Sequence, residues 1–240
     1  MLASLPLRLA LLPVLLPQAL AVRRRALLLP EAAGPRIGSA GQGPVLRLLI
    51  FGDSSAAGVG AATQDQALAG RLVADLARDF TVDWRLEART GATSAQALAH
   101  LRGLAPGSLD VAVGALGVND VTRQVSLRRW RADQAAIADL VRLRGARLLI
   151  RSGLPPMDRF PLLPRPLRDV LGAQARAFDA ALAADSTGPL MHLPFDAARL
   201  DPAQMAADGF HPGPTIYADW AKVLAALIRD GLRRDGFPAT

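Results

Sequence analysis

From Leu46 onward the sequence predicts an α/β domain with a mostly parallel central sheet. Short apolar segments of strand length alternate with longer segments in which apolar residues recur at helical spacing. The short segments are almost continuously apolar, as expected for parallel strands that helices cover on both faces. This alternation of strands and helices is typical of the α/β class.

Five strands are expected, each an apolar run that stops at a turn of small or polar residues. The first carries the sequence VLRLLIF and ends at Gly52. The five expected strands are Val45–Phe51, Val82–Ala88, Leu109–Leu116, Ala146–Arg151 and Pro189–Leu193.

Helices are expected between these strands and after the last one. Thr63–Gln66 has the spacing of a capping box, and apolar residues then recur on one face from Leu68 to Phe80. Another helix should follow Asn119, where apolar residues recur from Leu127 to Val141, and a last one should begin at Pro214. In the last helix the residues expected to face the sheet are Ile216, Trp220, Val223, Leu224 and Leu227.

Residues 1–44 differ in kind, and we expect an appendage and flexible linker before a domain of residues 45–240. An apolar stretch interrupted by prolines is followed by Arg23–Arg25. One interpretation is an interfacial segment of a cytoplasmic protein with peripheral membrane association; another is an arm packed against the domain. A third is a signal peptide that is cut after Ala21 and leads to export. Positive charge after the apolar stretch favours the cytoplasmic side, and the prolines leave less than the roughly twenty residues that a span needs.

Composition excludes several other functions. The 240 residues, 51% hydrophobic and 20% charged, suit one soluble domain with one substantial core. The net charge of +7 does not predict a nucleic-acid partner, because the arginines are spread along the chain and no recognition motif is present. The absence of cysteine excludes disulfides, thiolate catalysis and sulfur-ligated metals.

Ser54 is the candidate nucleophile. It follows Asp53 in the turn after the first strand, and Gly58 and Gly60 are expected to keep the next backbone thin enough for a substrate to approach. A serine hydroxyl needs a base, and of the three histidines only His211 lies in a suitable loop, with Asp208 three residues before it. His192 is expected to be a satisfied core residue and His100 a surface residue.

Two further blocks follow apolar strands and offer oxyanion donors. ARTGATSA contains Gly91, and GALGVNDVT contains Gly117, Asn119 and Asp120. Ligands of open parallel sheets gather beyond the carboxyl ends of the strands, where these blocks are expected to meet Ser54.

Together and in this order, the four blocks resemble the SGNH hydrolases, also called GDSL-type esterases and lipases. The resemblance extends from Leu46 to about Arg233. It implies Ser54 as nucleophile, Asp208 and His211 as the rest of a triad, and Ser54, Gly91 and Asn119 as oxyanion donors. Many members have Leu where this chain has Ser55. The expected fold is therefore a three-layer α/β/α sandwich of flavodoxin-like type, with a five-stranded parallel sheet of order 2-1-3-4-5.

The implied function is a serine esterase that forms an acyl-enzyme, favours short to medium acyl chains and needs neither metal nor cofactor. Its substrate is a small-molecule or lipid ester. Lysophospholipase, thioesterase and carbohydrate deacetylase activities of the same superfamily stay open, as does a catalytically silent binding domain. An α/β-hydrolase is disfavoured because Ser54 follows the first strand, and a dinucleotide site is disfavoured because Thr63 stands where its third glycine belongs.

Residues 152–167 form a proline-rich segment without regular periodicity. It is either a stiff connector that covers the edge of the sheet or the wall of a substrate pocket. On the second interpretation, Met157 and Phe160 face the site.

Overall fold

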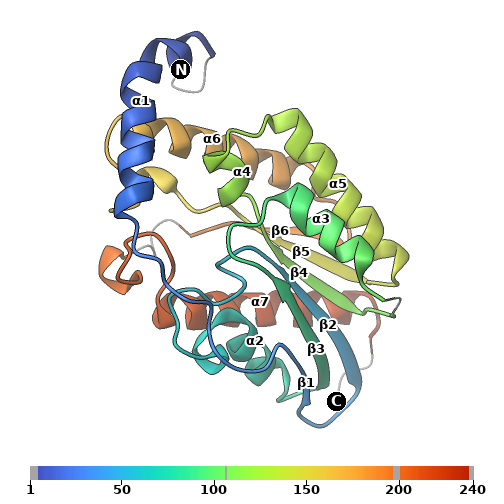
Figure 1. Ribbon diagram of the computed structural model, residues 1–240. Helices are drawn as coiled ribbons and strands as arrows, with labels where there is room; N and C mark the ends of the chain where they lie inside the picture. The colour runs from blue at the N-terminus through green and yellow to red at the C-terminus, as the bar shows by residue number, and fades with distance from the viewer. Residues whose placement is uncertain (1–4, 106, 197–200, 238–240) are drawn as a thin grey trace.

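A six-stranded sheet lies between two layers of helices in the computed structural model, which describes residues 5–105, 107–196 and 201–237. Helices α2 and α7 cover one face of the sheet, and α3, α5 and α6 cover the other (Figure 1). The strands are β1 (Ile37–Ala40), β2 (Val45–Gly52), β3 (Thr81–Ala88), β4 (Val111–Ala115), β5 (Leu148–Ser152) and β6 (Leu190–Leu193). The helices are α1 (Leu5–Arg25), α2 (Leu68–Leu76), α3 (Ser94–Gly103), α4 (Val118–Thr122), α5 (Leu127–Leu143), α6 (Leu167–Ala184) and α7 (Pro214–Arg234), with short 3-10 turns at Gln64–Gln66, Met157–Arg159 and Pro202–Gln204.

The strand order is β1-β3-β2-β4-β5-β6, and every neighbouring pair is parallel except β1 with β3. The five expected strands are β2 to β6, and their order is the predicted 2-1-3-4-5. The three-layer, flavodoxin-like fold is therefore confirmed, with six strands rather than five. The added strand β1 has the sequence IGSA, which lacks a run of large apolar residues and so gave no strand signal.

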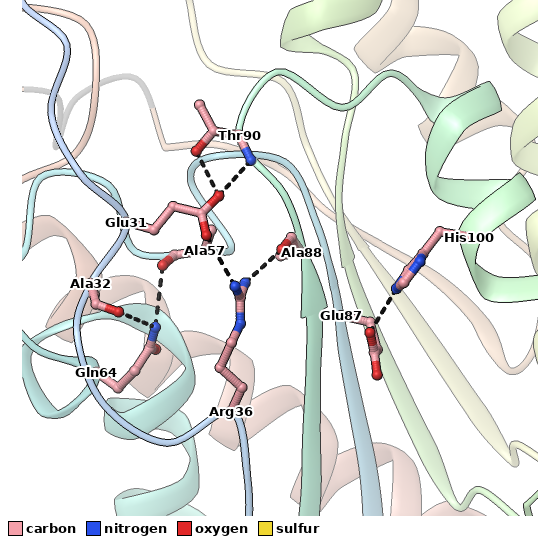
Figure 2. Close-up of polar contacts among 9 residues, drawn as sticks. All are labelled: Glu31, Ala32, Arg36, Ala57, Gln64, Glu87, Ala88, Thr90 and His100. Carbon is pink, nitrogen blue, oxygen red and sulfur yellow. Dashed lines mark hydrogen bonds and ion pairs between the residues drawn. The ribbon is translucent and has the colours of Figure 1, made fainter. Parts of the chain in front are cut away.

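The segment before β2 is fixed to the domain, which corrects the expectation of a flexible approach. Figure 2 shows Glu31 accepting hydrogen bonds from the backbone N–H and hydroxyl of Thr90, at 2.7 and 2.8 Å. Arg36 donates to the other Glu31 oxygen at 3.0 Å and to the carbonyl of Ala88 at 2.5 Å. These bonds connect the segment to the loop that follows β3. They depend on partners more than fifty residues away, which no local pattern reveals.

The start of α2 also differs from the expected capping box. Thr63 makes no side-chain cap, and the chain forms a 3-10 turn before α2 begins at Leu68. The buried amide of Gln64 instead donates to the carbonyls of Ala32 and Ala57, both at 3.2 Å (Figure 2). A capping box does form at the start of α3, between Thr93 and Gln96.

Three apolar clusters fill the fold. One lies between the sheet and the α2–α7 layer, and one lies between the sheet and the α3–α5 layer. The third joins α6 to the proline-rich segment, and Leu15 of α1 is buried in it. Helix α1 is further held by Gln18, whose amide donates to the Arg165 carbonyl at 2.6 Å and accepts from the Leu167 N–H at 3.1 Å.

The buried face of α7 is rotated from the expected one. Of the residues expected to face the sheet, only Leu224 is fully buried, and Val223 is 39% exposed. The residues of α7 that fill the core are Tyr217, Ala221, Leu224, Ala225, Ile228 and Leu232. Alanines and a tyrosine supply much of this face, so counting large aliphatic residues misplaced it.

Candidate active site

Three parallel strands end beside one another and carry the predicted site residues into one region. The chain leaves β2 at Gly52, and the Asp53 N–H donates to the Ala115 carbonyl at the end of β4, at 3.1 Å. A Cβ on Gly52 would lie 2.3 Å from that carbonyl oxygen, so only glycine allows this close approach. The turn with Ser54 is thereby fixed next to the end of β4, which leads into the short helix α4 that contains Asn119.

Ser54, His211 and Asp208 form a continuous hydrogen-bonded line. The Ser54 Oγ is 2.8 Å from His211 Nε2, and His211 Nδ1 is 2.5 Å from Asp208 Oδ2. The carboxylate can only accept, so Nδ1 carries the proton and Nε2 can accept from the serine hydroxyl. This arrangement can take a proton from Ser54 during attack on a carbonyl carbon.

The Asp-x-x-His spacing is explained by a tight turn. Asp208 Oδ1 accepts the backbone N–H groups of Phe210 and His211, both at 3.0 Å, which returns His211 to the carboxylate. Burial alone would raise the pKa of Asp208, but hydrogen bonds from the His211 side chain and from these N–H groups lower the pKa overall. Asp208 therefore stays ionised and can stabilise an imidazolium.

Gly58 and Gly60 contact protein rather than leaving room for a substrate, which corrects the prediction. A Cβ on Gly60 would lie 2.2 Å from the Pro212 carbonyl oxygen, and one on Gly58 would lie 2.7 Å from the Ala32 Cβ. Both glycines have positive φ, at 98° and 84°. Gly60 therefore lets the loop after Ser54 pack against the loop that carries His211, whereas Gly58 lets it pack against Ala32 and Ala67.

Asn119 connects the turn that carries Ser54 with the loop that contains Gly91. The Asn119 side-chain amide donates to the Ala92 carbonyl at 3.1 Å and approaches Asp53 Oδ2 at 3.4 Å. Gly91 has φ 77°, and its carbonyl accepts from Arg123 at 3.0 Å. Within the described chain, the backbone N–H groups of Ser54 and Gly91 have no recorded acceptor and can serve an oxyanion.

Asp53 and Ser55 form a pair that sequence reasoning missed. Asp53 Oδ1 accepts the Ser55 N–H at 2.9 Å and the Ser55 hydroxyl at 2.8 Å. Burial raises the pKa of Asp53, and the Ser55 hydrogen bonds and the nearby His211 partly offset that rise. The Asp-x-Ser spacing, which is typical of a turn closed by an aspartate side chain, could have predicted this pair from the sequence. Ser55, in place of the Leu of many members, thus stabilises the nucleophile turn.

A second buried carboxylate lies behind this region. Asp120 accepts the Ser94 N–H at 3.0 Å and the Ser94 hydroxyl at 2.9 Å, and Gln134 donates to the same hydroxyl oxygen at 2.9 Å. Burial raises the pKa of Asp120 to about 6. The hydrogen bonds from Ser94 lower this pKa, and the negative charges of Asp53 and Asp133 raise it further.

This raised pKa predicts a pH-dependent stability. An unfolded aspartate has a pKa near ~3.9, so between about pH 4 and 6 the folded state binds more protons at Asp120 than the unfolded state does. Stability from this group is therefore lost as pH rises. Relative to Asp120→Asn, the unfolding free energy of the wild type should fall by about 2 to 3 kcal/mol from pH 4 to pH 7 in urea titrations. A difference that stays constant over this range would contradict the prediction.

An apolar cavity of about 310 Å³ opens beside Ser54 and His211. Of the two residues expected to face the site, Phe160 is in the cavity lining, whereas Met157 is fully buried in the neighbouring apolar cluster and is not among the lining residues. Ile216, Trp220 and Val223 of α7 also line the cavity, so this side of the helix faces the site. Trp220 still packs against the sheet, where its Nε1 donates to the Ser152 hydroxyl of β5 at 3.2 Å. Apolar lining next to a nucleophile suits the acyl part of an ester.

The other two histidines are paired away from Ser54. The exposed His100 lies 2.7 Å from Glu87, as Figure 2 shows, which agrees with the predicted surface position. His192 lies 2.8 Å from Asp179 and is mostly buried, so it is a satisfied residue as expected.

A family model and one relative each match most of the chain. A model of the GDSL-like Lipase/Acylhydrolase family matches residues 50–218. The chain is 31% identical over 227 residues to the GDSL-like esterase Rv1075c of Mycobacterium tuberculosis, covering 85% of this chain and 70% of that protein.

Solved structures of the same fold superpose on most of this chain. The lipase Lip_vut3 from a goat rumen metagenome superposes with a TM-score of 0.59 at 16% identity, covering 75% of this chain and 96% of that one. TesA superposes with a TM-score of 0.56 at 25% identity, covering 78% and 98%. The chain thus belongs to the GDSL-like lipase/acylhydrolase family of SGNH hydrolases and is a hydrolase that acts on ester bonds.

Proposed function

We propose that this hydrolase cleaves carboxylic esters through an acyl-enzyme on Ser54, with His211 as the base and Asp208 as its orienting acid. The observation that carries the proposal is the unbroken line from Ser54 Oγ through His211 to Asp208, with distances of 2.8 and 2.5 Å, at the edge of an apolar cavity. The chemistry requires no metal and no cofactor.

Acylation follows from this geometry. The Ser54 Oγ attacks the ester carbonyl carbon while its proton moves to His211 Nε2, and the carbonyl π electrons move to oxygen. The resulting imidazolium is stabilised by Asp208, whose pKa is lowered. His211 then returns the proton to the leaving alkoxide as the C–O bond breaks, which releases the alcohol.

Deacylation repeats these steps with water. His211 Nε2 takes a proton from a water molecule as its oxygen attacks the acyl carbon, and the proton then returns to Ser54 Oγ as the acid leaves. In both halves the negative oxygen needs donors. We assign this role to the Ser54 and Gly91 N–H groups, on the loops after β2 and β3, and to the Asn119 side-chain amide, in the short helix α4 after β4.

The cavity supports a preference for short to medium acyl chains. Its volume of about 310 Å³ lies at the lower end of the range of roughly 300 to 1,000 Å³ for ligand pockets, and its walls are largely apolar. Phe160 contacts Phe210 edge to face at 5.0 Å, and Phe210 contacts His211 in the same way at 5.3 Å. Phe160 thus forms one wall of the cavity, and the ring of Phe210 lies between it and His211.

Alanine variants of Phe160 and Met157 distinguish a residue that selects the acyl chain from one that only stabilises the fold. Phe160→Ala should shift the preferred p-nitrophenyl ester toward longer chains, because it enlarges the lined cavity. Met157→Ala should leave the chain-length profile unchanged and lower the unfolding free energy by about 2 to 5 kcal/mol, as a buried large-to-small change does. A Phe160→Ala profile identical to that of the wild type would contradict the assigned wall.

A panel of p-nitrophenyl esters, acetylated sugars, acyl thioesters and lysophospholipids tests the proposed function. We expect turnover of the simple esters with chains of up to medium length. Turnover confined to the sugar, thioester or lysophospholipid substrates would assign one of the alternative activities, and none at all would indicate a binding domain.

A further inference from the structure

Helix α1 is apolar on its outward face as well as on the face that packs against the domain. The inward face consists of Leu11, Leu15, Gln18 and Val22, at helical spacing. On the other side the apolar residues are in solvent: Leu12 is 39% exposed, Val14 46%, Leu16 58% and Leu20 55%. Ala10, Pro13, Pro17 and Ala19, also exposed, complete a face without charge. A helix that is apolar all round is normally covered by something.

The charges at the end of this helix indicate what covers it. Arg23, Arg24 and Arg25 form its last turn, and all three are exposed. No acidic residue precedes Glu31 in the sequence. Every charged side chain from Met1 to Pro30 is therefore positive, which is complementary to an anionic lipid surface.

The helix is connected to the substrate cavity through a shared apolar cluster. Leu15 belongs to the same apolar cluster as Leu154 and Phe160, which line the cavity. In Figure 1, α1 stands on the side of the molecule where the parallel strands end, next to the start of α6. Within the described ranges, no helix is long and apolar enough to cross a bilayer.

From these observations we infer that the outward face of α1 binds the surface of an anionic membrane on its cytoplasmic side, lying in the headgroup boundary. Leu12, Val14, Leu16 and Leu20 enter the lipid, and Arg23–Arg25 meet the phosphates. In this position the cavity opens close to the bilayer, so that esters dissolved in lipid reach Ser54 with a short transfer. This last step rests on the proposed function, whereas membrane binding does not.

Vesicle flotation of the full chain tests the binding. Vesicles of phosphatidylcholine with phosphatidylglycerol should carry the protein, and pure phosphatidylcholine vesicles should carry much less. Arg23→Gln/Arg24→Gln/Arg25→Gln should lower the partition constant on the order of 100-fold at low salt, at about 1 kcal/mol for each basic residue near the surface. Leu12→Gln/Leu16→Gln/Leu20→Gln should lower it at least ~10-fold on either type of vesicle.

Matched control variants test whether vesicle binding depends on α1 itself or only on the total positive charge and exposed apolar surface of the protein. Arg102→Gln/Arg128→Gln/Arg142→Gln removes three exposed arginines from α3 and α5, and Ile37→Gln/Val45→Gln/Leu143→Gln removes three exposed apolar residues from β1, β2 and α5. Both controls should float like the wild type. Equal losses in the controls and the α1 variants, or equal flotation on neutral and anionic vesicles, would overturn the inference.

Two further readouts keep membrane binding apart from catalysis. All α1 variants should hydrolyse a soluble p-nitrophenyl ester at the wild-type rate, while losing the faster hydrolysis of an ester embedded in anionic vesicles. Peptide mapping of protein from the native host should recover the segment from Leu12 to Arg25 intact. Cleavage after Ala21 would remove most of the face and end the inference, without affecting the proposed chemistry of Ser54.

Discussion

Ser54→Ala and His211→Ala are each expected to lower kcat for a p-nitrophenyl ester by at least about 10⁴-fold. Without the Ser54 hydroxyl no acyl-enzyme can form, and without His211 that hydroxyl loses the base that lies 2.8 Å from it. Asp208→Ala should cost less, since the imidazole keeps its base nitrogen and loses only its orientation and countercharge. Steady-state kinetics of the three variants measure these losses.

The two large losses should not add. When two residues act as one unit in a proton transfer, the first substitution already removes most of the rate acceleration. The kcat of Ser54→Ala/His211→Ala should therefore resemble that of either single variant. Thermal unfolding serves as the control, because each of these side chains is at the cavity edge rather than in a packed cluster. Additive losses in the double variant would show that the two side chains act independently.

Asn119→Ala should lower kcat by about 10²- to 10³-fold, which corresponds to roughly 3 to 4 kcal/mol of barrier, and should change KM little. The charge on the carbonyl oxygen is fully developed only near the transition state, so a donor aimed at it contributes there. A variant with unchanged kcat and raised KM would make Asn119 an ordinary ground-state contact.

Asn119 has a structural bond as well, and a matched variant accounts for it. Its amide donates to the Ala92 carbonyl, while Arg123 braces the same loop through the Gly91 carbonyl. Arg123→Ala removes a loop contact without removing a proposed donor, so it should cost far less in kcat. If Arg123→Ala and Asn119→Ala had equal effects, loop support rather than oxyanion stabilisation would explain both.

The strands of the parallel sheet were predictable from local patterns, and their order from the resemblance to the SGNH hydrolases; together these predict the neighbourhood of the site residues. Buried parallel strands are apolar runs, and Ser54 and Asn119 directly follow two of them, so adjacency of the strands brings these residues together. The Asp208–His211 turn was predictable for the same reason, since its spacing alone returns the histidine to the carboxylate.

The rest depended on contacts that are distant in sequence. β1 is defined by its antiparallel pairing with β3 rather than by its own residues. Glu31 and Arg36 fix the linker through atoms of the loop after β3. The cavity is lined by Phe160 together with residues of α7. Which face of α7 is buried depends on a distant contact, since the Tyr217 hydroxyl donates to the Val59 carbonyl at 2.7 Å.

Labelling with a fluorophosphonate probe, followed by intact mass and peptide mapping, tests the central claim most directly. The account predicts one adduct for each chain, on the peptide that contains Ser54, formed quickly by the wild type and by Phe160→Ala. Ser54→Ala should not be labelled, and His211→Ala should be labelled far more slowly because the hydroxyl has lost its base. An adduct on another serine, or undiminished labelling of Ser54→Ala, would contradict the assignment of Ser54 as the nucleophile.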